Sequence, residues 1–495
     1  MKKTSIALAI AALFAFHHGA HAGPEGGKVV AGQASIAQKG GATTIEQTSP
    51  RAIINWNSFN IGAGERVQHD MPGADSHGLY RVTGGGGASQ LAGELRSNGN
   101  IYIVNPAGVV INKGAKIDVG GFLATPNNIA DENFMAGKLR FDQPGQPGAA
   151  VVNLGRISVR DSGFAALVAP AVRNDGIIAA RLGRVALASG GAYTLDLHGD
   201  ELIAFTAPEA VVNGLDGANG EPLGVSNGGR IEAEGGVVLL TASQLDGIVK
   251  SVINNGGTVS AASAELEGGR IVFKGQGANV DVLNTGAVTA SSQNGDGGGI
   301  RMTADGHVAS SGTVEATGGG KGGNVVLTGL ETALTEQARI DVSGAQGGGT
   351  VLVGGNALGQ GPEKNAEHTR IGKDAVIAAD ATASGNGGQV VVWGGQSAVF
   401  DGTISARGGA QGGDGGKVET SGAALKVGAT ARVDTSAAAG KFGEWLLDPT
   451  DFTVAASGGD MTGATLSANL GNNNVVIHIS MGTAAQMGIF SSTTP

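Results

Sequence analysis

The sequence of 495 residues contains no cysteine, and its aromatic residues amount to only 4%. Disulfide bonds therefore cannot hold the fold together, which excludes the small disulfide-rich class of secreted domains. A β-propeller or a β-sandwich is the alternative to the fold derived below. Propellers usually carry an aromatic signature in each blade, and three tryptophans cannot supply it. Charged residues make up 15%, with a formal net charge of −10. This acidic balance offers no electrostatic surface for nucleic acid, so we expect no nucleic-acid partner.

Long hydrophobic runs are also absent. No segment reaches the about 18 uninterrupted apolar residues that a transmembrane helix needs, so we expect no transmembrane segment. The shorter apolar stretch at residues 6–16 follows two lysines and precedes the small residues Ala20 and Ala22. This order is typical of a signal peptide, with a buried N-terminal helix as the alternative. We expect residues 1–22 to be a signal peptide that is cleaved before Gly23.

Glycine, by contrast, is abundant. The chain holds 90 glycines, more than double the average usage of roughly 7%. There is no strict Gly-X-Y period, which excludes a collagen triple helix. Hydrophobic residues make up 41%, which is too many for a disordered chain. Many tight turns combined with small apolar side chains indicate a β-solenoid.

A repeated unit supports the solenoid from about residue 183 onward. A glycine pair, a spacer residue and a short β-branched run recur, as in Gly268-Gly269-Arg270-Ile271-Val272-Phe273 and Gly322-Gly323-Asn324-Val325-Val326-Leu327. The starts lie roughly 25 to 39 residues apart, in the range of solenoid repeats. Further short runs of period two lie between them, at residues 279–282 and 286–290. We predict an all-β, right-handed parallel β-helix with three strands per coil, in which glycine supplies positive φ at the corners.

Three segments near the N-terminus resemble a known family. Ile53-Ile54-Asn55-Trp56-Asn57-Ser58-Phe59-Asn60-Ile61-Gly62 resembles an "INWxxFNIG" segment. Asn105-Pro106-Ala107-Gly108-Val109 resembles an "NPNGI" signature, with alanine and valine in place of asparagine and isoleucine. Gly121-Phe122-Leu123-Ala124-Thr125 resembles the following "GFxAST" stretch. The chain thus resembles the two-partner secretion domains at the N-terminus of filamentous-haemagglutinin-like adhesins. The resemblance is close over residues 25–140, and the remainder is similar in its glycine-rich character.

The resemblance implies a domain organisation. Residues 23–182 would be the secretion domain, forming an elaborated N-terminal cap of the β-helix. Residues 183–440 would be the glycine-rich β-helix repeats. Residues 441–495 would be an adhesin-like segment, because Gly443-Glu444-Trp445-Leu446-Leu447-Asp448-Pro449 resembles part of large adhesins. Whether this segment is a truncated end of a longer protein is left open.

The resemblance also implies a function. Such a chain reaches the periplasm and is recognised there by the periplasmic domains of a cognate outer-membrane β-barrel transporter. It then passes through the transporter, folds outside, and is secreted or stays at the cell surface. There it would act as an adhesin on host or bacterial cell surfaces, or as a secretion-competent fragment of one. The alternatives are a β-helical polysaccharide-active enzyme and a carrier of a missing C-terminal toxin.

Two of these segments supply the candidate site: residues 53–62, the first signature, and residues 105–109, the second signature. We expect ten residues either to contact the transporter or to form a corner of the coil: Asn55, Trp56, Asn57, Phe59, Asn60, Asn105, Pro106, Ala107, Gly108 and Val109. The corner is the alternative to direct contact, because Asn-Pro-x-Gly is strong turn chemistry in which proline fixes φ and glycine permits the left-handed position.

We expect no catalytic site, no cofactor and no metal. No metal-ligand spacing pattern matches the polar residues clustered in one turn, His69, Asp70, Asp75 and His77. Glu232 and Glu234 could mimic the paired carboxylates of a glycosidase, but isolated pairs of this kind are usually a solvated face. Sequence motifs of P-loops, zinc proteases and serine hydrolases are absent.

Overall fold

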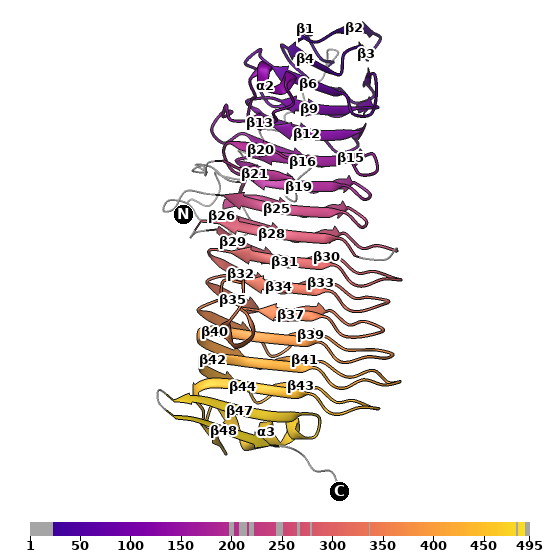
Figure 1. Ribbon diagram of the computed structural model, residues 1–495. Helices are drawn as coiled ribbons and strands as arrows, with labels where there is room; N and C mark the ends of the chain where they lie inside the picture. The colour runs from indigo at the N-terminus through magenta and orange to yellow at the C-terminus, as the bar shows by residue number, and fades with distance from the viewer. Residues whose placement is uncertain are drawn as a thin grey trace.

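The computed structural model describes residues 23–197, 202–206, 215–216, 222–243, 251–264, 268–277, 280–335, 337–481 and 484–490. The chain winds into a long rod of stacked coils, with residues near 50 at one end and residues near 450 at the other (Figure 1). The predicted signal peptide, with Ala20 and Ala22, falls outside the described residues, whereas Gly23 lies within them. No helix in the described part of the chain is long and apolar enough to cross a membrane.

The rod has three faces, each a ladder of mainly parallel strands. The first face contains β4 (Arg51–Trp56), β6 (His77–Val82), β9 (Asn100–Val104), β12 (Gly121–Thr125), β16 (Phe164–Ala169), β19 (Arg184–Ser189), β25 (Val237–Ser243), β28 (Arg270–Gln276), β31 (Gly299–Ala304), β34 (Asn324–Thr328), β37 (Thr350–Val353), β40 (Gln389–Phe400), β42 (Lys417–Val427), β44 (Glu444–Asp451) and β47 (Asn474–Met481).

The second face contains β7 (Ser89–Leu91), β10 (Gly108–Ile111), β14 (Ala150–Asn153), β17 (Ala171–Asn174), β23 (Pro222–Asn227), β26 (Ser251–Asn255), β29 (Val280–Asn284), β32 (His307–Ser310), β35 (Glu331–Leu334) and β38 (His368–Ile371). The long strands β40 and β42 run from the first face into the second, which joins the two faces into one 28-stranded sheet.

The third face is a separate 15-stranded sheet. It contains β2 (Ala34–Lys39), β3 (Ala42–Gln47), β5 (Arg66–Asp70), β8 (Glu94–Ser97), β11 (Lys116–Val119), β15 (Arg156–Val159), β18 (Ile177–Ala179), β24 (Arg230–Glu232), β27 (Thr258–Ser260), β30 (Ala287–Thr289), β33 (Thr313–Glu315), β36 (Arg339–Asp341), β39 (Val376–Ala378), β41 (Thr403–Ser405) and β43 (Arg432–Asp434).

The predicted β-helix with three strands per coil is confirmed. One coil consists of β28, β29 and β30, which overlap the runs that the sequence predicted as strands. Parallel pairing keeps equivalent residues in register, so Ile271, Ile300, Val325 and Val351 stack inside the rod. Alternate residues point out, and this explains the period-two pattern of these short runs.

The glycine pairs have a different role from the predicted one. The repeat pairs are Gly268-Gly269, Gly322-Gly323, Gly348-Gly349, Gly387-Gly388 and Gly415-Gly416, and none of these glycines has the positive φ that we expected at the corners. Instead, a Cβ on Gly322 would overlap the carbonyl oxygen of Val342 in the next coil, and a Cβ on Gly323 would overlap that of Gly298 in the preceding coil. The expectation was wrong for the pairs because close backbone approach between coils, and not backbone conformation, requires glycine there.

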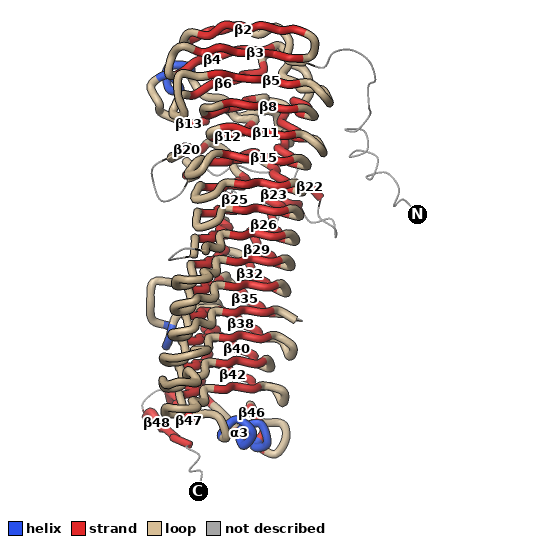
Figure 2. Tube along the Cα trace, turned by 90° about the vertical axis from the view of Figure 1, so that its right-hand side faces the viewer, coloured by secondary structure: helices blue, strands red, loops and turns tan. Residues whose placement is uncertain are grey.

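The N-terminal end of the rod is an elaborated cap. Strand β1 (Lys28–Ala31) pairs antiparallel with β4, and β2 pairs antiparallel with β3, before parallel stacking begins. Figure 2 shows β2 as the last strand at this end of the rod. Antiparallel strands thus cover the first parallel strands, whose backbone groups would otherwise form an open edge.

A second hydrophobic layer covers the first face near the cap. It is built by helix α2 (Asp131–Met135) together with the short strands β13 (Arg140–Phe141), β20 (Tyr193–Leu195) and β21 (Ile203–Phe205). Figure 1 shows this layer beside the first-face strands from β6 to β19. Phe134, Phe141 and Tyr193 are fully buried in it against Tyr102 and its neighbours on the first face. The first-face strands under this layer are therefore covered by apolar side chains on both sides.

Helix α3 (Gly463–Leu470) covers the opposite end of the third face. Asn469 Oδ1 accepts a hydrogen bond from the Val433 amide at 2.7 Å. Asn473, just after the helix, accepts from the Thr435 amide at 2.8 Å and donates to the Val433 carbonyl at 2.7 Å. The two side chains thus pair with β43 as the backbone of a further strand would. Strands β45 (Val454–Ala455), β46 (Met461–Thr462), β22 (Leu215–Asp216) and β48 (Ala484–Phe490) and the 3-10 helix η1 (Ala357–Gly359) complete the fold.

Candidate functional site

The first signature segment spans the end of β4 and the corner that follows it. Trp56 and Phe59 are each 1% exposed, and their ring centroids lie 5.5 Å apart. Phe59 also packs on Tyr80 at 4.7 Å. Both aromatic residues of the signature therefore fill the first coils of the core, and neither is available on the surface of the folded protein.

The asparagines of this segment lie nearer the surface. Asn57 is exposed, and its backbone amide donates to the Glu25 carbonyl at 2.9 Å. Asn60 is half-buried, and its side-chain oxygen accepts from the Gln90 amide at 2.8 Å. Asn55, also half-buried, lies 3.4 Å from the Arg81 guanidinium. They connect the corner to three other parts of the cap.

The second signature segment forms a tight corner between β9 and β10. Asn105 is 2% exposed, and its side-chain oxygen accepts from the Ala107 amide at 2.9 Å. The Gly108 amide closes the turn on the Asn105 carbonyl at 2.8 Å. Gly108 has a φ of 103°, and a Cβ there would overlap the Ala150 carbonyl oxygen. Both the backbone conformation and the lack of space therefore require glycine. The turn chemistry predicted for Asn-Pro-x-Gly is confirmed.

Strand β7 brings the two signatures together. The Asn105 amide group donates to the Ser89 hydroxyl at 3.0 Å and to the Gly87 carbonyl at 3.1 Å. Asn60 binds Gln90 of the same strand, as described above. Strand β7 also pairs in parallel with β10, which continues the second signature. The two segments, far apart in sequence, therefore lie two coils apart, on either side of the coil that contains β6 and β7.

Half of the ten predicted residues are accessible in this arrangement. Asn57 is exposed, and Asn55, Asn60, Pro106 and Ala107 are half-buried. The other five are buried: Trp56, Phe59, Asn105, Gly108 and Val109.

The sequence analysis placed His69 and His77 in one polar turn, which is wrong: His69 lies on β5 and His77 on β6, and both side chains are buried. His69 is fully buried and shares a hydrogen bond of 2.6 Å with the Tyr80 hydroxyl, and His77 shares one of 2.9 Å with Tyr102. Burial lowers the pKa of His69 to about 3. Burial, assisted by the charge of Arg51, lowers the pKa of His77 to about 4. Both rings are neutral at physiological pH, and within the described residues no three His, Asp or Glu side chains converge to hold a metal ion.

Arg81 is a further residue near the signatures whose contacts the sequence analysis did not predict. It links the first face to the layer around α2. Its guanidinium lies 2.7 Å from the Asp131 carboxylate and donates to the Asn128 side chain at 2.8 Å and the Ile129 carbonyl at 2.9 Å. Its side chain is only 11% exposed, so this ion pair is largely shielded from solvent on the arginine side. Only the tertiary fold brings these groups together.

A ladder of buried asparagines runs through the second face beyond the signatures. Each side chain donates to the next across successive coils at 2.7 to 2.8 Å, and the last donates to a serine hydroxyl at 3.1 Å. The members, which are at most 1% exposed, are Asn153, Asn174, Asn227, Asn255, Asn284 and Ser310. The ladder satisfies polar groups inside the rod and fixes the register of its coils.

The acidic pair considered for catalysis lies at and just beyond the end of β24. Glu232 lies 3.1 Å from the Arg230 guanidinium on the same strand, and Glu234 lies exposed beyond the end of β24. The structure supports the interpretation of this pair as a solvated face.

The chain matches the family model described as the TPS secretion domain over residues 20–289. The match runs past residue 182, where we expected the secretion domain to end, and the predicted domain boundaries stay predictions. Among solved structures, the HMW1 secretion domain from Haemophilus influenzae superposes with a TM-score of 0.64 at 30% identity, over 86% of this chain and 100% of that one.

Two heme/hemopexin-binding proteins of Haemophilus influenzae are similar in sequence. One is 36% identical over 197 residues, which is 38% of this chain and 21% of the relative. The other is 44% identical over 86 residues, which is 17% of this chain and 9% of the relative. The matched part thus spans about a fifth or less of the length of these relatives. Since the family model covers more than half of the 495 residues, the chain belongs to the TPS secretion domain family.

Proposed function

We propose that this chain is an exoprotein that a cognate outer-membrane β-barrel transporter carries from the periplasm to the outside. The observation that carries the proposal is the family match over residues 20–289, together with the coiled fold shared with the HMW1 secretion domain. Each coil of a solenoid contacts mainly its neighbours, so the chain can fold coil by coil as it emerges. This folding would favour outward movement without a nucleotide.

The test is secretion by the full chain, with its signal peptide, in cells with and without the transporter. The proposal expects intact protein in the medium only when the transporter is present, and periplasmic retention otherwise. Equal amounts in the medium under both conditions would refute transporter dependence. A transporter with its periplasmic domains deleted is the matched control, because it separates recognition from the presence of a pore.

We infer that within the signatures the transporter contacts the accessible residues Asn55, Asn57, Asn60, Pro106 and Ala107. Asn105 contributes by shaping the corner that presents Pro106 and Ala107, since its own side chain is bonded to Ser89 and Gly87. Binding of the full chain to the isolated periplasmic domains would test this. Asn57→Ala should weaken binding while leaving the fold intact, and unchanged affinity would exclude this contact.

Outside the cell, the proposed activity is non-enzymatic adhesion at a host or bacterial surface. The outer surface of the rod is polar and repetitive, with few aromatic side chains, so each single contact is weak. Adhesion would then depend on many copies acting together. We expect purified monomer to bind cells with a Kd in the micromolar range or weaker, near about −8 kcal/mol. Titration by surface plasmon resonance measures this directly.

The sequence match to the two heme/hemopexin-binding proteins favours a second candidate, capture of heme or hemopexin. The same purified chain, titrated with heme and with hemopexin separately, distinguishes the two candidates. A nanomolar Kd for either ligand would favour capture over adhesion. Micromolar or weaker binding to both would leave adhesion as the better account.

A further inference from the structure

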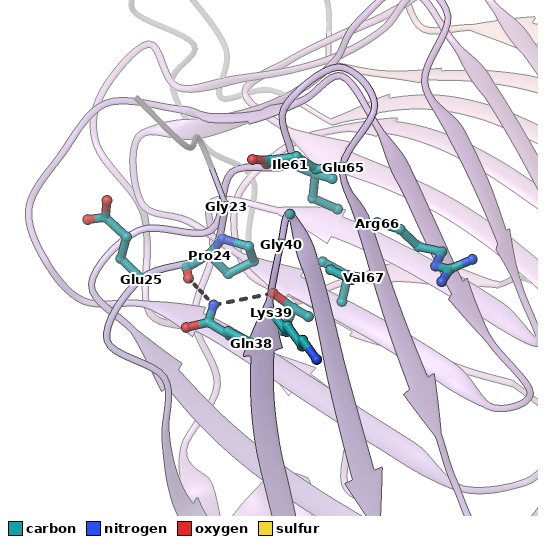
Figure 3. A pocket seen from close by; sticks show the side chains of 13 residues that line it. Gly23, Pro24, Glu25, Gln38, Lys39, Gly40, Ile61, Glu65, Arg66 and Val67 are labelled. Carbon is teal, nitrogen blue, oxygen red and sulfur yellow. Dashed lines mark hydrogen bonds between the residues drawn. The ribbon is translucent and has the colours of Figure 1, made fainter. Parts of the chain in front are cut away.

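The residues that follow the predicted cleavage site are part of the folded cap (Figure 3). Pro24 is buried, and its carbonyl oxygen accepts a hydrogen bond of 2.6 Å from the Gln38 side-chain amide. Glu25 forms an antiparallel bridge with Ser58, its amide donating to the Ser58 carbonyl at 2.9 Å. Its own carbonyl accepts from the Asn57 amide at 2.9 Å. The start of the mature chain is thus bound directly to the first signature.

A carboxylate lies beside Gly23. Oε2 of Glu65 would be 3.8 Å from a Cβ at Gly23, so a nitrogen on the same Cα would lie within about 6 Å of it. The same oxygen accepts a hydrogen bond of 2.7 Å from the Gly62 amide, which orients the carboxylate. Gly62 is the last residue of the first signature. Opposite charges at this separation favour each other's ionised form.

Gly23 and Glu65 line a cavity of about 330 Å³. Three other charged side chains also line it: Glu25, Lys39 and Arg66. In Figure 3 the Glu25 carboxylate and the Arg66 guanidinium extend to opposite sides of Gly23. Among the charged residues of this cavity, Glu65 is therefore the best placed to receive a cation at Gly23.

We propose that signal-peptide cleavage creates the ligand for this site, the ammonium group of Gly23, which pairs with Glu65 and fastens residues 23–25 to the cap. Before cleavage the Gly23 nitrogen is an uncharged amide. Water hydrolyses the Ala22–Gly23 peptide bond, and Ala22 leaves as a carboxylate while Gly23 keeps a protonated amine. The proposal rests on the proposed export and on cleavage after Ala22.

The consequence is a coupling between processing and the order of the cap. Residues 23–25 hold the backbone of Asn57 and Ser58, so fastening them also fixes the first signature. An uncleaved chain lacks the positive charge and would hold this segment less firmly. Processing would therefore be a condition for a fully ordered cap.

The experiment measures the pKa of the terminal amine in the full mature protein. Competitive acetylation from about pH 6 to about pH 10, followed by mass spectrometry of the N-terminal peptide, reports it. We expect a pKa above the ordinary value of about 7.7–8.0, and a fall of about half a unit or more in Glu65→Gln. Glutamine keeps an acceptor for the Gly62 amide. Glu46→Gln removes the same charge from an exposed position on β3 and should leave the pKa unchanged.

Hydrogen exchange supplies an independent readout. The amides of Glu25 and Asn57 should exchange several-fold faster in Glu65→Gln and in N-acetylated wild-type protein, but not in Glu46→Gln. Equal terminal pKa values in wild type and Glu65→Gln would overturn the proposal, as would equal exchange rates. A mature terminus other than Gly23 would also overturn it, but transporter-dependent secretion would then persist, so the two failures are distinguishable.

Discussion

At the glycine pairs, the absence of a Cβ atom allows neighbouring coils to stack closely. A Cβ on Gly298 would overlap the carbonyl oxygen of Gly269 in the preceding coil, whereas a Cβ on the adjacent Gly299 would meet open space. Neither residue has a positive φ, so backbone strain does not distinguish them. Two neighbouring glycines of the same repeat thus differ in the space available for a Cβ, and they offer a matched pair of substitutions.

We predict that Gly298→Ala lowers the free energy of unfolding by about 1–3 kcal/mol, because the coils must separate to admit a methyl group. Gly299→Ala should be neutral or stabilising by up to about 1 kcal/mol, since it only restricts the unfolded chain. Urea unfolding of both variants measures the difference. Equal destabilisation by both would show that close approach between coils does not explain the glycine pairs.

The buried histidines make the cap sensitive to acid. In the folded protein the pKa values of His69 and His77 are about 3 and about 4, whereas an unfolded histidine titrates near 6.5. Below about pH 6.5 the unfolded chain binds more protons, so stability falls as the pH drops toward 4, and these groups add no pH dependence above 7. Each histidine contributes a slope of up to about 1.4 kcal/mol per pH unit.

Melting temperatures between about pH 7.5 and about pH 4.5 test this contribution. The double variant His69→Gln, His77→Gln should lose stability less steeply with acid than the wild type, although it is less stable at neutral pH. Carboxylates elsewhere titrate equally in both proteins, so the comparison isolates the two histidines. An unchanged acid slope in the variant would contradict their assigned role.

At the scale of elements, the asparagine ladder shows how polar side chains stabilise a coil interior. Asn227 is fully buried, accepts from Asn174 and donates to Asn255. Beyond Ser310 the same register position holds the apolar residues Leu334, Ile371 and Phe400. The position therefore accepts either chemistry, provided that no polar partner is left without a hydrogen bond.

We predict that Asn227→Ala lowers the free energy of unfolding by about 2–4 kcal/mol, because it leaves a donor on Asn174 and an acceptor on Asn255 unsatisfied. Asn254→Ala is the matched control. The Asn254 side chain points to the other side of β26, and its buried oxygen has no hydrogen-bond partner, so its loss should cost little. Similar losses in both variants would exclude the ladder as a specific source of stability.

The elements also show what could be predicted from the sequence. The alternation around Ile271 and the turn at Gly108 depend on neighbouring residues, so the strand and the corner were predicted correctly. The His69–Tyr80 bond, the Arg81–Asp131 ion pair and the pairing of Asn469 with β43 join residues on different coils or on added segments. Repeats of unequal length hide the register between coils, so these contacts could not be found without the structure.

At the scale of the whole molecule, the two signatures act as parts of one cap. Trp56 and Phe59 fill its core, Asn105 shapes its corner, and β7 joins both segments. The same cap receives the residues that follow the predicted cleavage site, at Glu25. We propose that the buried signature residues serve secretion through the fold of the first coils.

The most direct test is Asn105→Ala, measured for both secretion and stability in the same full-length chain. The change removes the donors to Ser89 and Gly87 and the side-chain acceptor for the Ala107 amide, at a cost of about 2–3 kcal/mol. The account predicts that the secreted fraction and the urea midpoint of the protein fall together relative to wild type. Loss of secretion with a wild-type urea midpoint would contradict it and would assign Asn105 to direct contact with the transporter.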